Sequence, residues 1–139
     1  MMGEREEEGG RELFEADDLA ASLTVRDLEA SIAWYCDVLG FGLAKRFERD
    51  GKLMAARLKA GRVLLLLGQD DGGKGLDRVK GEGFSLQLTT RQDVDAIAAR
   101  VREAGTTLDT EPSDTPWGAR IMRLRDPDGF RFTISSGIA

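Results

Sequence analysis

Apolar and polar residues alternate with a period of two between residues 19 and 26. The apolar positions of this stretch are Leu19, Ala21, Leu23 and Val25. Successive side chains of a strand point to opposite faces of its sheet, so the alternation predicts a strand with one packed face and one different face.

A helical spacing follows directly. Asp27 is the predicted N-cap, because its carboxylate can accept hydrogen bonds from the free backbone N–H groups of a first helical turn. The apolar positions of the predicted helix are Leu28, Ile32, Tyr35 and Leu39, which form one stripe. Gly40 is the predicted end, where a left-handed residue is needed.

Three strands are predicted after this helix. Residues 41–48 and 52–59 flank Asp50-Gly51, a residue pair typical of a tight hairpin turn. Residues 62–67 are apolar at nearly every position. A strand that is apolar on both faces is expected in the centre of a sheet.

The same order of elements begins again after residues 69–82, which are rich in glycine and charge and are predicted to be a linker. The apolar positions are Phe84, Leu86 and Leu88 in the next predicted strand and Val94, Ile97, Val101 and Ala104 in the next predicted helix. Thr90 and Asp93 are the predicted caps at the start of this helix, and Gly105 is its predicted end.

Short strands near residues 107–109, 119–125 and 130–135 complete the second half. The last two are joined by Asp126-Pro127-Asp128-Gly129, which fits a type I turn with Asp first, Pro second and Gly fourth. The turn alone accounts for both aspartates. The chain is therefore predicted to contain two copies of strand–helix–strand–strand–strand, in a single domain of residues 17–137 with modules of about 17–68 and 83–137.

Charge and composition indicate which binding partners and which cellular location to expect. The net charge is −5, and residues 1–12 alone hold five acidic and two basic residues, so residues 1–16 are predicted to be a disordered acidic tail. The start of the chain is not typical of a signal peptide, and no apolar run reaches the roughly 20 residues that cross a bilayer. Cys36 is the only cysteine, which favours a cytoplasmic protein without internal disulfides. No basic run points to nucleic acid.

The chain of 139 residues contains no histidine. This excludes Ser/His and Cys/His nucleophilic catalysis and histidine-based zinc or non-heme iron sites. It also removes the usual general base near neutral pH. We therefore expect no catalytic residue of these types.

Three stretches together resemble the glyoxalase/bleomycin-resistance/dioxygenase group, also called the vicinal oxygen chelate superfamily. Residues 25–41 resemble its first-module signature, Pro116-Trp117-Gly118-Ala119-Arg120 resembles a stretch before its penultimate strand, and residues 126–130 resemble its closing hairpin. The resemblance covers residues 17–136. It implies an α+β fold with two βαβββ modules, whose curled mixed sheets surround a cleft and whose helices lie outside.

The resemblance also places the metal site of metal-using members. Those members take ligands from the first and last strands of each module, and the matching positions here are Ala20, Leu65, Ser85 and Thr133, with Leu65 uncertain by one position in a run of leucines. None of these side chains is a carboxylate or an imidazole, and hard cations prefer charged oxygen. We therefore expect no metal and no cofactor.

The alternation defines the side chains expected to face the cleft. They are Ala20, Ser22, Thr24, Ser85, Gln87, Thr89, Arg131, Thr133 and Ser135. Most are small, neutral and able to form hydrogen bonds. Such a surface suits a polar organic ligand and offers no group that moves a proton near pH 7.

Trp117 and the arginines leave two interpretations open. Trp117 fits an aromatic wall for a planar ligand or an anchor that packs its loop on the module. Arg120 and Arg131 fit a clamp for a carboxylate or phosphate, or solvated strand positions. The candidate ligand-binding residues are Ser22, Thr24, Ser85, Gln87, Trp117, Arg120 and Thr133.

The leading hypothesis is a non-catalytic protein that binds a small organic ligand and sequesters an antibiotic or another natural product, cationic or aromatic in character. The resemblance implies a homodimer with clefts at or near the subunit interface. A second hypothesis is a lyase, isomerase or dioxygenase of the same superfamily with an atypical or absent metal site. A third is an interaction module that keeps the fold for dimerisation alone.

Overall fold

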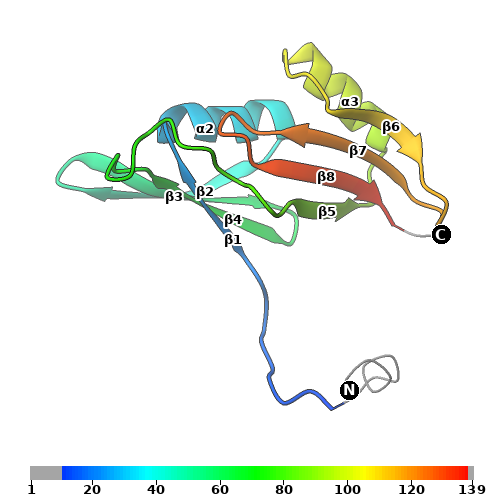
Figure 1. Cartoon of the computed structure of the whole chain (residues 1–139), viewed down its shortest axis with the longest axis horizontal. Coiled ribbons are helices and arrows are strands. Elements are labelled where there is room, and N and C mark those ends of the chain that lie inside the picture. Colours follow the sequence, from blue (N-terminus) through cyan, green and yellow to red (C-terminus); the bar gives the residue numbers. More distant parts are fainter. Residues whose placement is uncertain (1–10, 138–139) are drawn as a thin grey trace.

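Each half of the chain folds into a strand, a helix and three further strands (Figure 1). The computed structural model describes residues 11–137. Module one contains β1 (Ala21–Val25), α2 (Leu28–Trp34), η1 (Tyr35–Leu39), β2 (Gly42–Arg49), β3 (Lys52–Ala60) and β4 (Val63–Gln69). Module two contains β5 (Leu86–Thr90), α3 (Val94–Glu103), β6 (Thr110–Asp114), β7 (Arg120–Arg125) and β8 (Arg131–Ser136).

The two sheets have the same strand order. Module one is ordered β1-β4-β3-β2 and module two β5-β8-β7-β6. The first strand of each sheet runs parallel to the last, and the other neighbours are antiparallel. The predicted α+β fold of two βαβββ modules is confirmed, and the apolar strand β4 lies between β1 and β3 as expected. No helix within residues 11–137 is long and apolar enough to span a bilayer.

The first helix begins and ends where the residues predict. Asp27 accepts a hydrogen bond from the Ala30 N–H at 3.1 Å, and Gly40 has a φ of +83°. Its last turn widens into the π-helix η1. The wider turn places Val38 in the core and leaves Leu39, the predicted position, only half-buried.

The strand predicted at residues 107–109 begins three residues later in the structure. The strand β6 covers Thr110–Asp114, and its pairing with β7 is irregular between Thr110 and Ser113. Pro112 lies inside this stretch and has no N–H to donate to a neighbouring strand. Because β6 is short and irregular, apolar and polar residues alternate little along it. The sequence pattern therefore predicts its position incorrectly.

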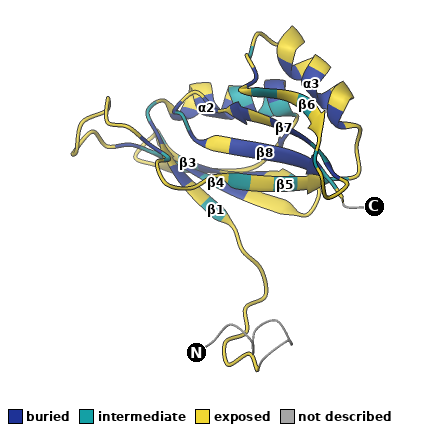
Figure 2. Cartoon of the chain, turned by 45° about the vertical axis from the view of Figure 1, so that its right-hand side comes forward, coloured by how far each residue is buried: buried dark blue, intermediate teal, exposed yellow. Residues whose placement is uncertain are grey.

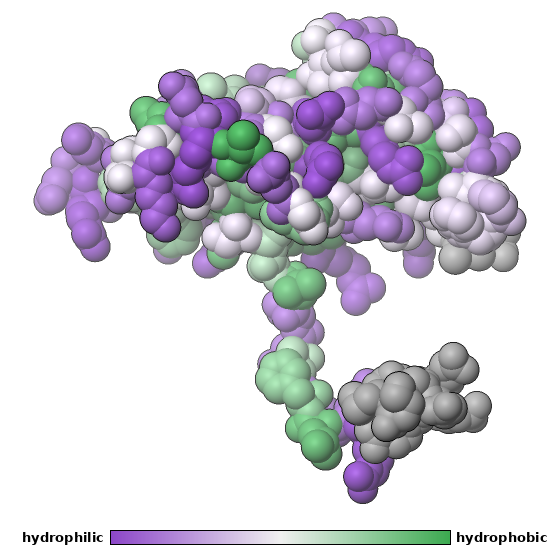
Figure 3. All heavy atoms as spheres, in the orientation of Figure 1, coloured by the Kyte–Doolittle hydropathy of each residue, from purple (hydrophilic) through white to green (hydrophobic). Residues whose placement is uncertain are grey.

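The segment before β1 runs away from both sheets (Figure 1). Leu13, Phe14 and Leu19 are 94%, 83% and 95% exposed, so they add nothing to the core of this chain. Hydrophobic residues along this segment stand apart from the largely hydrophilic surface shown in Figure 3. The disorder predicted for residues 1–16 lies mostly outside the described residues and stays a prediction, as do the predicted module and linker boundaries.

Both helices lie on the same side of the sheets, and helices and strands both carry buried residues (Figure 2). One apolar cluster contains residues from both modules. At its centre Tyr35 is fully buried, and its ring meets Phe41 of module one at 5.7 Å and Phe132 of module two at 5.9 Å, edge to face. The two modules therefore share a core on the helix side.

The turn between β7 and β8 is bonded to module one. The Tyr35 hydroxyl donates to Asp126 Oδ2 at 2.6 Å, and Asp126 Oδ1 accepts from the N–H groups of Asp128 and Phe130 at 2.9 and 2.8 Å. The Arg26 N–H donates to Asp128 Oδ1 at 2.9 Å. The expectation that the turn alone accounts for both aspartates is therefore incomplete.

Burial dominates the electrostatics of this contact. It raises the pKa of Tyr35 well above its ordinary value, with a further contribution from the charge of Asp126. Burial also raises the pKa of Asp126, although the hydroxyl of Tyr35 and the N–H of Phe130 oppose that shift. A buried carboxylate of this kind depends on every donor it has.

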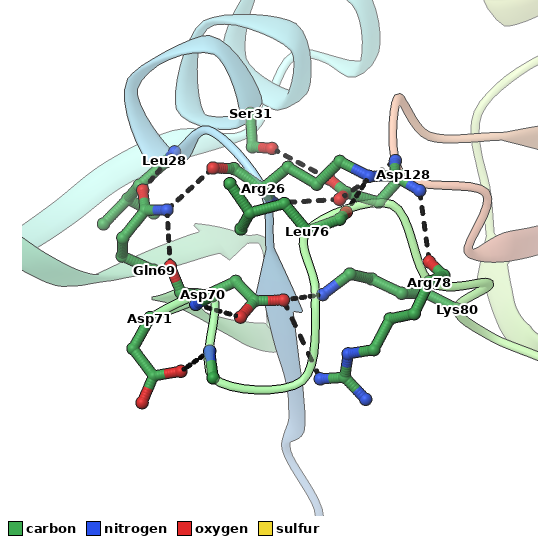
Figure 4. Close-up of polar contacts among 12 residues, drawn as sticks. Arg26, Leu28, Ser31, Gln69, Asp70, Asp71, Leu76, Arg78, Lys80 and Asp128 are labelled. Carbon is green, nitrogen blue, oxygen red and sulfur yellow. Dashed lines mark hydrogen bonds and ion pairs between the residues drawn. The ribbon is translucent and has the colours of Figure 1, made fainter.

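The linker is anchored at both ends by polar contacts (Figure 4). The Arg26 guanidinium donates to the carbonyl oxygens of Leu76 and Arg78 at 2.6 and 3.2 Å. Lys80 forms an ion pair with Asp70, and both side chains are almost fully buried. The segment between β4 and β5 therefore has a defined path against β1 without regular secondary structure.

We predict that Tyr35→Phe destabilises the fold by about 1–3 kcal/mol, because Asp126 Oδ2 loses its donor inside the core. Urea unfolding measures the change. Ser31→Ala is the matched control, since Ser31 donates to the same turn only through a 3.5 Å contact with Asp128, and it should cost less. If Tyr35→Phe had the same free energy of unfolding as the parent chain, the hydrogen bond from Tyr35 to Asp126 would not stabilise the fold as predicted.

A second prediction concerns pH. The hydrogen bond from Lys80 holds the pKa of Asp70 below its ordinary value, so this pair stabilises the fold above about pH 4 and loses its effect as the pH falls through the folded-state pKa. Lys80→Met should lower the urea midpoint at pH 7, and the difference from the parent chain should shrink toward pH 2. Arg46→Gln, which breaks an exposed pair with Glu29, should change little at either pH.

Candidate functional site

Each sheet has one face covered by a helix and one face turned away from it, which we call the open face. Helix α2 contacts β3 and β4, and α3 contacts β6, β7 and β8. On β4 the buried residues Leu65 and Leu67 alternate with the more exposed Leu64 and Leu66. Because side chains alternate along a strand, residues opposite the buried positions lie on the open face.

In module two the open face carries most of the residues expected to line a cleft. The register places Thr133 of β8 between Gln87 of β5 and Arg123 of β7. One step along the strands, Ser135 lies between Thr89 and Ile121. Thr133 and Ser135 are only 9% and 4% exposed.

In module one Ser22 and Thr24 lie on the open face, and β4 takes the one-residue shift that the sequence left open. Ser22 and Thr24 are exposed and pair with Leu66 and Gly68. Leu65, the expected counterpart of a metal ligand, is 2% exposed and belongs to the core on the helix side. A shift of one residue reverses the face of a strand, so Leu64 and Leu66 are the open-face residues.

A first hollow lies on the open face of module two and has a volume of about 350 Å³. We call it the polar hollow. Its polar lining consists of Ser85, Asp109, Arg123, Arg131 and Thr133. Asp109 is already paired with Arg125 through two contacts of 2.9 and 3.2 Å, and this bond raises the pKa of Arg125.

A second hollow, also of about 350 Å³, lies between β1 and β5, the edge strands of the two sheets. We call it the apolar hollow. Leucines of β1, β4 and β5 provide much of its lining, and Ser22 and Gln87 are its polar members. Phe84 and Phe132 line both hollows.

The structure brings together some of the predicted ligand-binding residues and separates others. Ser85 and Thr133 line the polar hollow, and Ser22 and Gln87 line the apolar hollow. Thr24, Trp117 and Arg120 line neither. Their predicted contacts with a ligand remain predictions.

Trp117 lies in a turn, and Arg120 lies on the helix side of its sheet. Trp117 is 61% exposed in the turn before β7. Arg120 points toward helix α3, where its guanidinium pairs with Asp95 at 2.6 Å and with Asp114 at 3.0 Å. The hydrogen bond to Asp95 is the main cause that raises the pKa of Arg120. This arginine is engaged inside its own module.

Sequence reasoning missed Arg123 and the exposure of Phe84. Arg123 lies between Met122 and Leu124, which are both fully buried, so the alternation in residues 120–125 could have placed it on the open face. Phe84 is expected to pack, yet it is 46% exposed. It lies two residues before the start of β5 and therefore outside the regular strand.

The open face does not offer the ligands of a divalent cation. The positions that match the metal ligands of the resembled family present the methyl group of Ala20, leucine side chains on β4 and the hydroxyls of Ser85 and Thr133. Among residues 11–137 no group of three or more His, Cys, Asp or Glu side chains could hold a metal ion. The residues present therefore do not fit the metal site of that family.

Comparison with known families identifies one match across most of the chain. Residues 18–134 match the family described as Glyoxalase/Bleomycin resistance protein/Dioxygenase superfamily. The chain is similar to a catechol-2,3-dioxygenase of Bacillus subtilis strain 168, with 31% identity over 112 residues. This match covers 78% of the chain but only 37% of the dioxygenase, so the chain spans little more than a third of that relative.

Two solved structures are also similar. A glyoxylase/bleomycin resistance protein/dioxygenase domain from Frankia sp. EAN1pec has 27% identity and a TM-score of 0.72, covering 89% of this chain and 99% of that one. TnmS3, an antibiotic binding protein from Streptomyces sp. CB03234, has 26% identity and a TM-score of 0.68, covering 88% of this chain and 98% of that one.

Proposed function

The chain belongs to the Glyoxalase/Bleomycin resistance protein/Dioxygenase superfamily, and from this we propose that it is a non-catalytic protein that binds a small organic ligand. Its activity is sequestration: an antibiotic or another natural product enters the open face, and its free concentration falls. The observation that carries this proposal is the chemistry of the four metal-ligand positions, which hold methyl, isobutyl and hydroxyl groups.

The side chains of the open face support binding rather than proton transfer. Ser85 and Thr133 present hydroxyls in one hollow, and Ser22 and Gln87 present a hydroxyl and an amide in the other. Each hollow has the volume of a small-molecule site, and such sites combine apolar walls with a few polar groups. Serine, threonine and glutamine do not act as general bases near pH 7 without an activating partner.

The comparison with TnmS3 supports an antibiotic as the ligand class. That protein is named as an antibiotic binding protein and shares 26% identity with nearly the whole of this chain. The proposal carries this class of ligand over to the present chain. The two hollows are where such a ligand would contact Ser85 and Gln87.

The alternative function is an enzyme of the same superfamily. It is favoured by the 31% identity with the catechol-2,3-dioxygenase. A metal-dependent lyase, isomerase or dioxygenase would need ligands outside the expected positions, and residues 11–137 offer no suitable cluster. The sequestering function therefore accounts better for the described residues.

A homodimer is part of the proposal. The open face exposes apolar side chains such as that of Leu64, which is 39% exposed. A second copy laid over this face would cover them and enclose the hollows. The cytoplasmic location and the absence of nucleic-acid and membrane partners also remain predictions from the sequence.

We predict that the protein retains no stoichiometric metal. Protein purified without chelators and then dialysed should contain less than about 0.1 equivalent of zinc, nickel, manganese or iron by elemental analysis, because hydroxyl and alkyl groups do not bind such ions tightly. Stoichiometric metal that survives dialysis would support the enzyme alternative instead.

The direct test is a thermal-shift screen with glycopeptide and aromatic antibiotics. A ligand at a hundred times its Kd stabilises the fold by about 2.7 kcal/mol, which raises the Tm by several degrees. Thr133→Val should weaken binding, whereas Thr107→Val, an exposed threonine outside both hollows, should not.

The same incubations also test for catalysis. Any stabilising compound should be recovered unchanged by mass spectrometry after prolonged incubation with the protein. Conversion of that compound would refute the non-catalytic role. Stabilisation by a simple metabolite but by no antibiotic would refute drug sequestration.

A further inference from the structure

The charges of this acidic chain are sorted between the two faces of its sheets. The net charge is −5, yet the strands place a set of basic residues on the open face. These residues are Lys45, Arg57 and Lys59 in module one and Arg123, Arg125 and Arg131 in module two. The face that could meet a ligand is therefore basic.

The register and the ring contacts establish this placement in module one. Arg57 pairs with Leu66 on one side and Lys45 on the other, and Leu66 belongs to the open face. The cationic groups of Lys45 and Arg57 both lie over the Phe47 ring, at 5.1 and 5.6 Å from its centre. All three side chains therefore share one face.

The strand register also places basic residues on the open face of module two. Arg123 lies opposite Thr133, and Arg125 lies opposite Arg131. The intervening residues of β7, Met122 and Leu124, are completely buried on the helix side. Three arginines therefore project from two neighbouring strands toward the open face.

The acidic residues that form ion pairs lie mainly on the helix side. Glu29 pairs with Arg46, Glu111 with Arg102, and Asp95 and Asp114 both pair with Arg120. On the open face Asp109 neutralises Arg125. Within the described part of the chain, Arg123 and Arg131 have no carboxylate partner at ion-pair distance.

These two arginines line the same polar hollow. The Arg131 guanidinium is positioned by the carbonyl oxygens of Gly81 and Phe84, each at 3.4 Å. Gly81 has a φ of +79° and packs so closely on Phe130 that a Cβ there would lie 3.0 Å from its ring. The end of the linker therefore holds Arg131 at the hollow, while Arg123 keeps its donors free among the described residues.

We propose that the polar hollow binds the carboxylate of a small aromatic acid, an inference that rests on the sequestering function proposed above. Arg123 and Arg131 provide planar guanidinium groups that match a carboxylate, and Ser85 and Thr133 add hydroxyl donors. A ligand carboxylate supplies the countercharge that these arginines lack within residues 11–137. Of the two characters considered from the sequence, cationic and aromatic, the proposed ligand keeps the aromatic one and carries a negative charge.

The aromatic part of the ligand is assigned to Phe84. Its ring is 46% exposed, lies 6.3 Å from Phe130 and lines the hollow beside Ser85. An exposed ring at the edge of a basic hollow provides a stacking surface next to the anion site. The volume of about 350 Å³ suits one or two fused rings.

The experiment compares three probes of one shape: 2-naphthoate, the neutral 2-naphthamide and the cationic 2-naphthylmethylamine. Isothermal titration should show that 2-naphthoate binds at least tenfold more tightly than either analogue, with an affinity that falls as salt is raised. Arg123→Gln should weaken 2-naphthoate at least tenfold and 2-naphthamide little. Arg102→Gln, which removes an equal charge from helix α3, should leave the affinity unchanged.

The outcomes separate this inference from the proposed function. Tighter binding of the amide or the amine, or an Arg123→Gln variant that binds 2-naphthoate like the parent, would overturn the carboxylate site while leaving a binding protein. Failure of all three probes would overturn the site, whereas failure of every antibiotic in the thermal-shift screen would overturn the proposed function. Inorganic phosphate or a single-stranded oligonucleotide that binds more tightly than 2-naphthoate would show a general anion surface and also refute the proposal.

Discussion

Two buried aspartates of one turn must be satisfied by the other half of the molecule. Asp126 takes its side-chain donor from Tyr35, and Asp128 takes a backbone donor from Arg26, both in module one. An unpaired carboxylate in such a place is costly, so the turn between β7 and β8 has one acceptable position. That position fixes module two against module one. The apolar hollow has lining from both modules, so its geometry depends on these bonds.

The second constraint is the side of the sheets on which the helices lie. Because both helices cover the same side, each strand has a helix face and an open face whose residues differ in kind. The helix face holds the core and most of the ion pairs. The open face holds hydroxyls, one amide, leucines and, within residues 11–137, two arginines without a carboxylate partner, and this composition does not fit a metal ion.

Local signals of the sequence predict local structure well. Asp27 and Gly40 bound the first helix, and Asp50 and Gly51 both have positive φ values, of 53° and 76°, as their tight turn requires. The repeat of strand, helix and three strands follows from two periodicities that both halves share. These features depend on neighbours along the chain, which the sequence displays directly.

The features that define the site depend on neighbours across strands, which the sequence does not display. Leu65 lies in a run of leucines where neither face is marked, so its orientation is decided by pairing with β1 and β3. Arg120 and Arg123 look alike in the sequence, yet Asp95 on helix α3 neutralises the first and leaves the second exposed. The wider turn η1 and the irregular β6 were equally hidden, because each departs from the period that predicts it.

The outer edges of the two sheets are built differently from their faces. The edge strand β6 is interrupted by Pro112, and the edge strand β2 has two register irregularities and carries Lys45 and Arg46. Proline, bulges and lysine at an edge discourage a foreign strand from adding to the sheet. The protein can thus leave apolar side chains uncovered on a sheet face without offering its backbone as a template for fibrous aggregation.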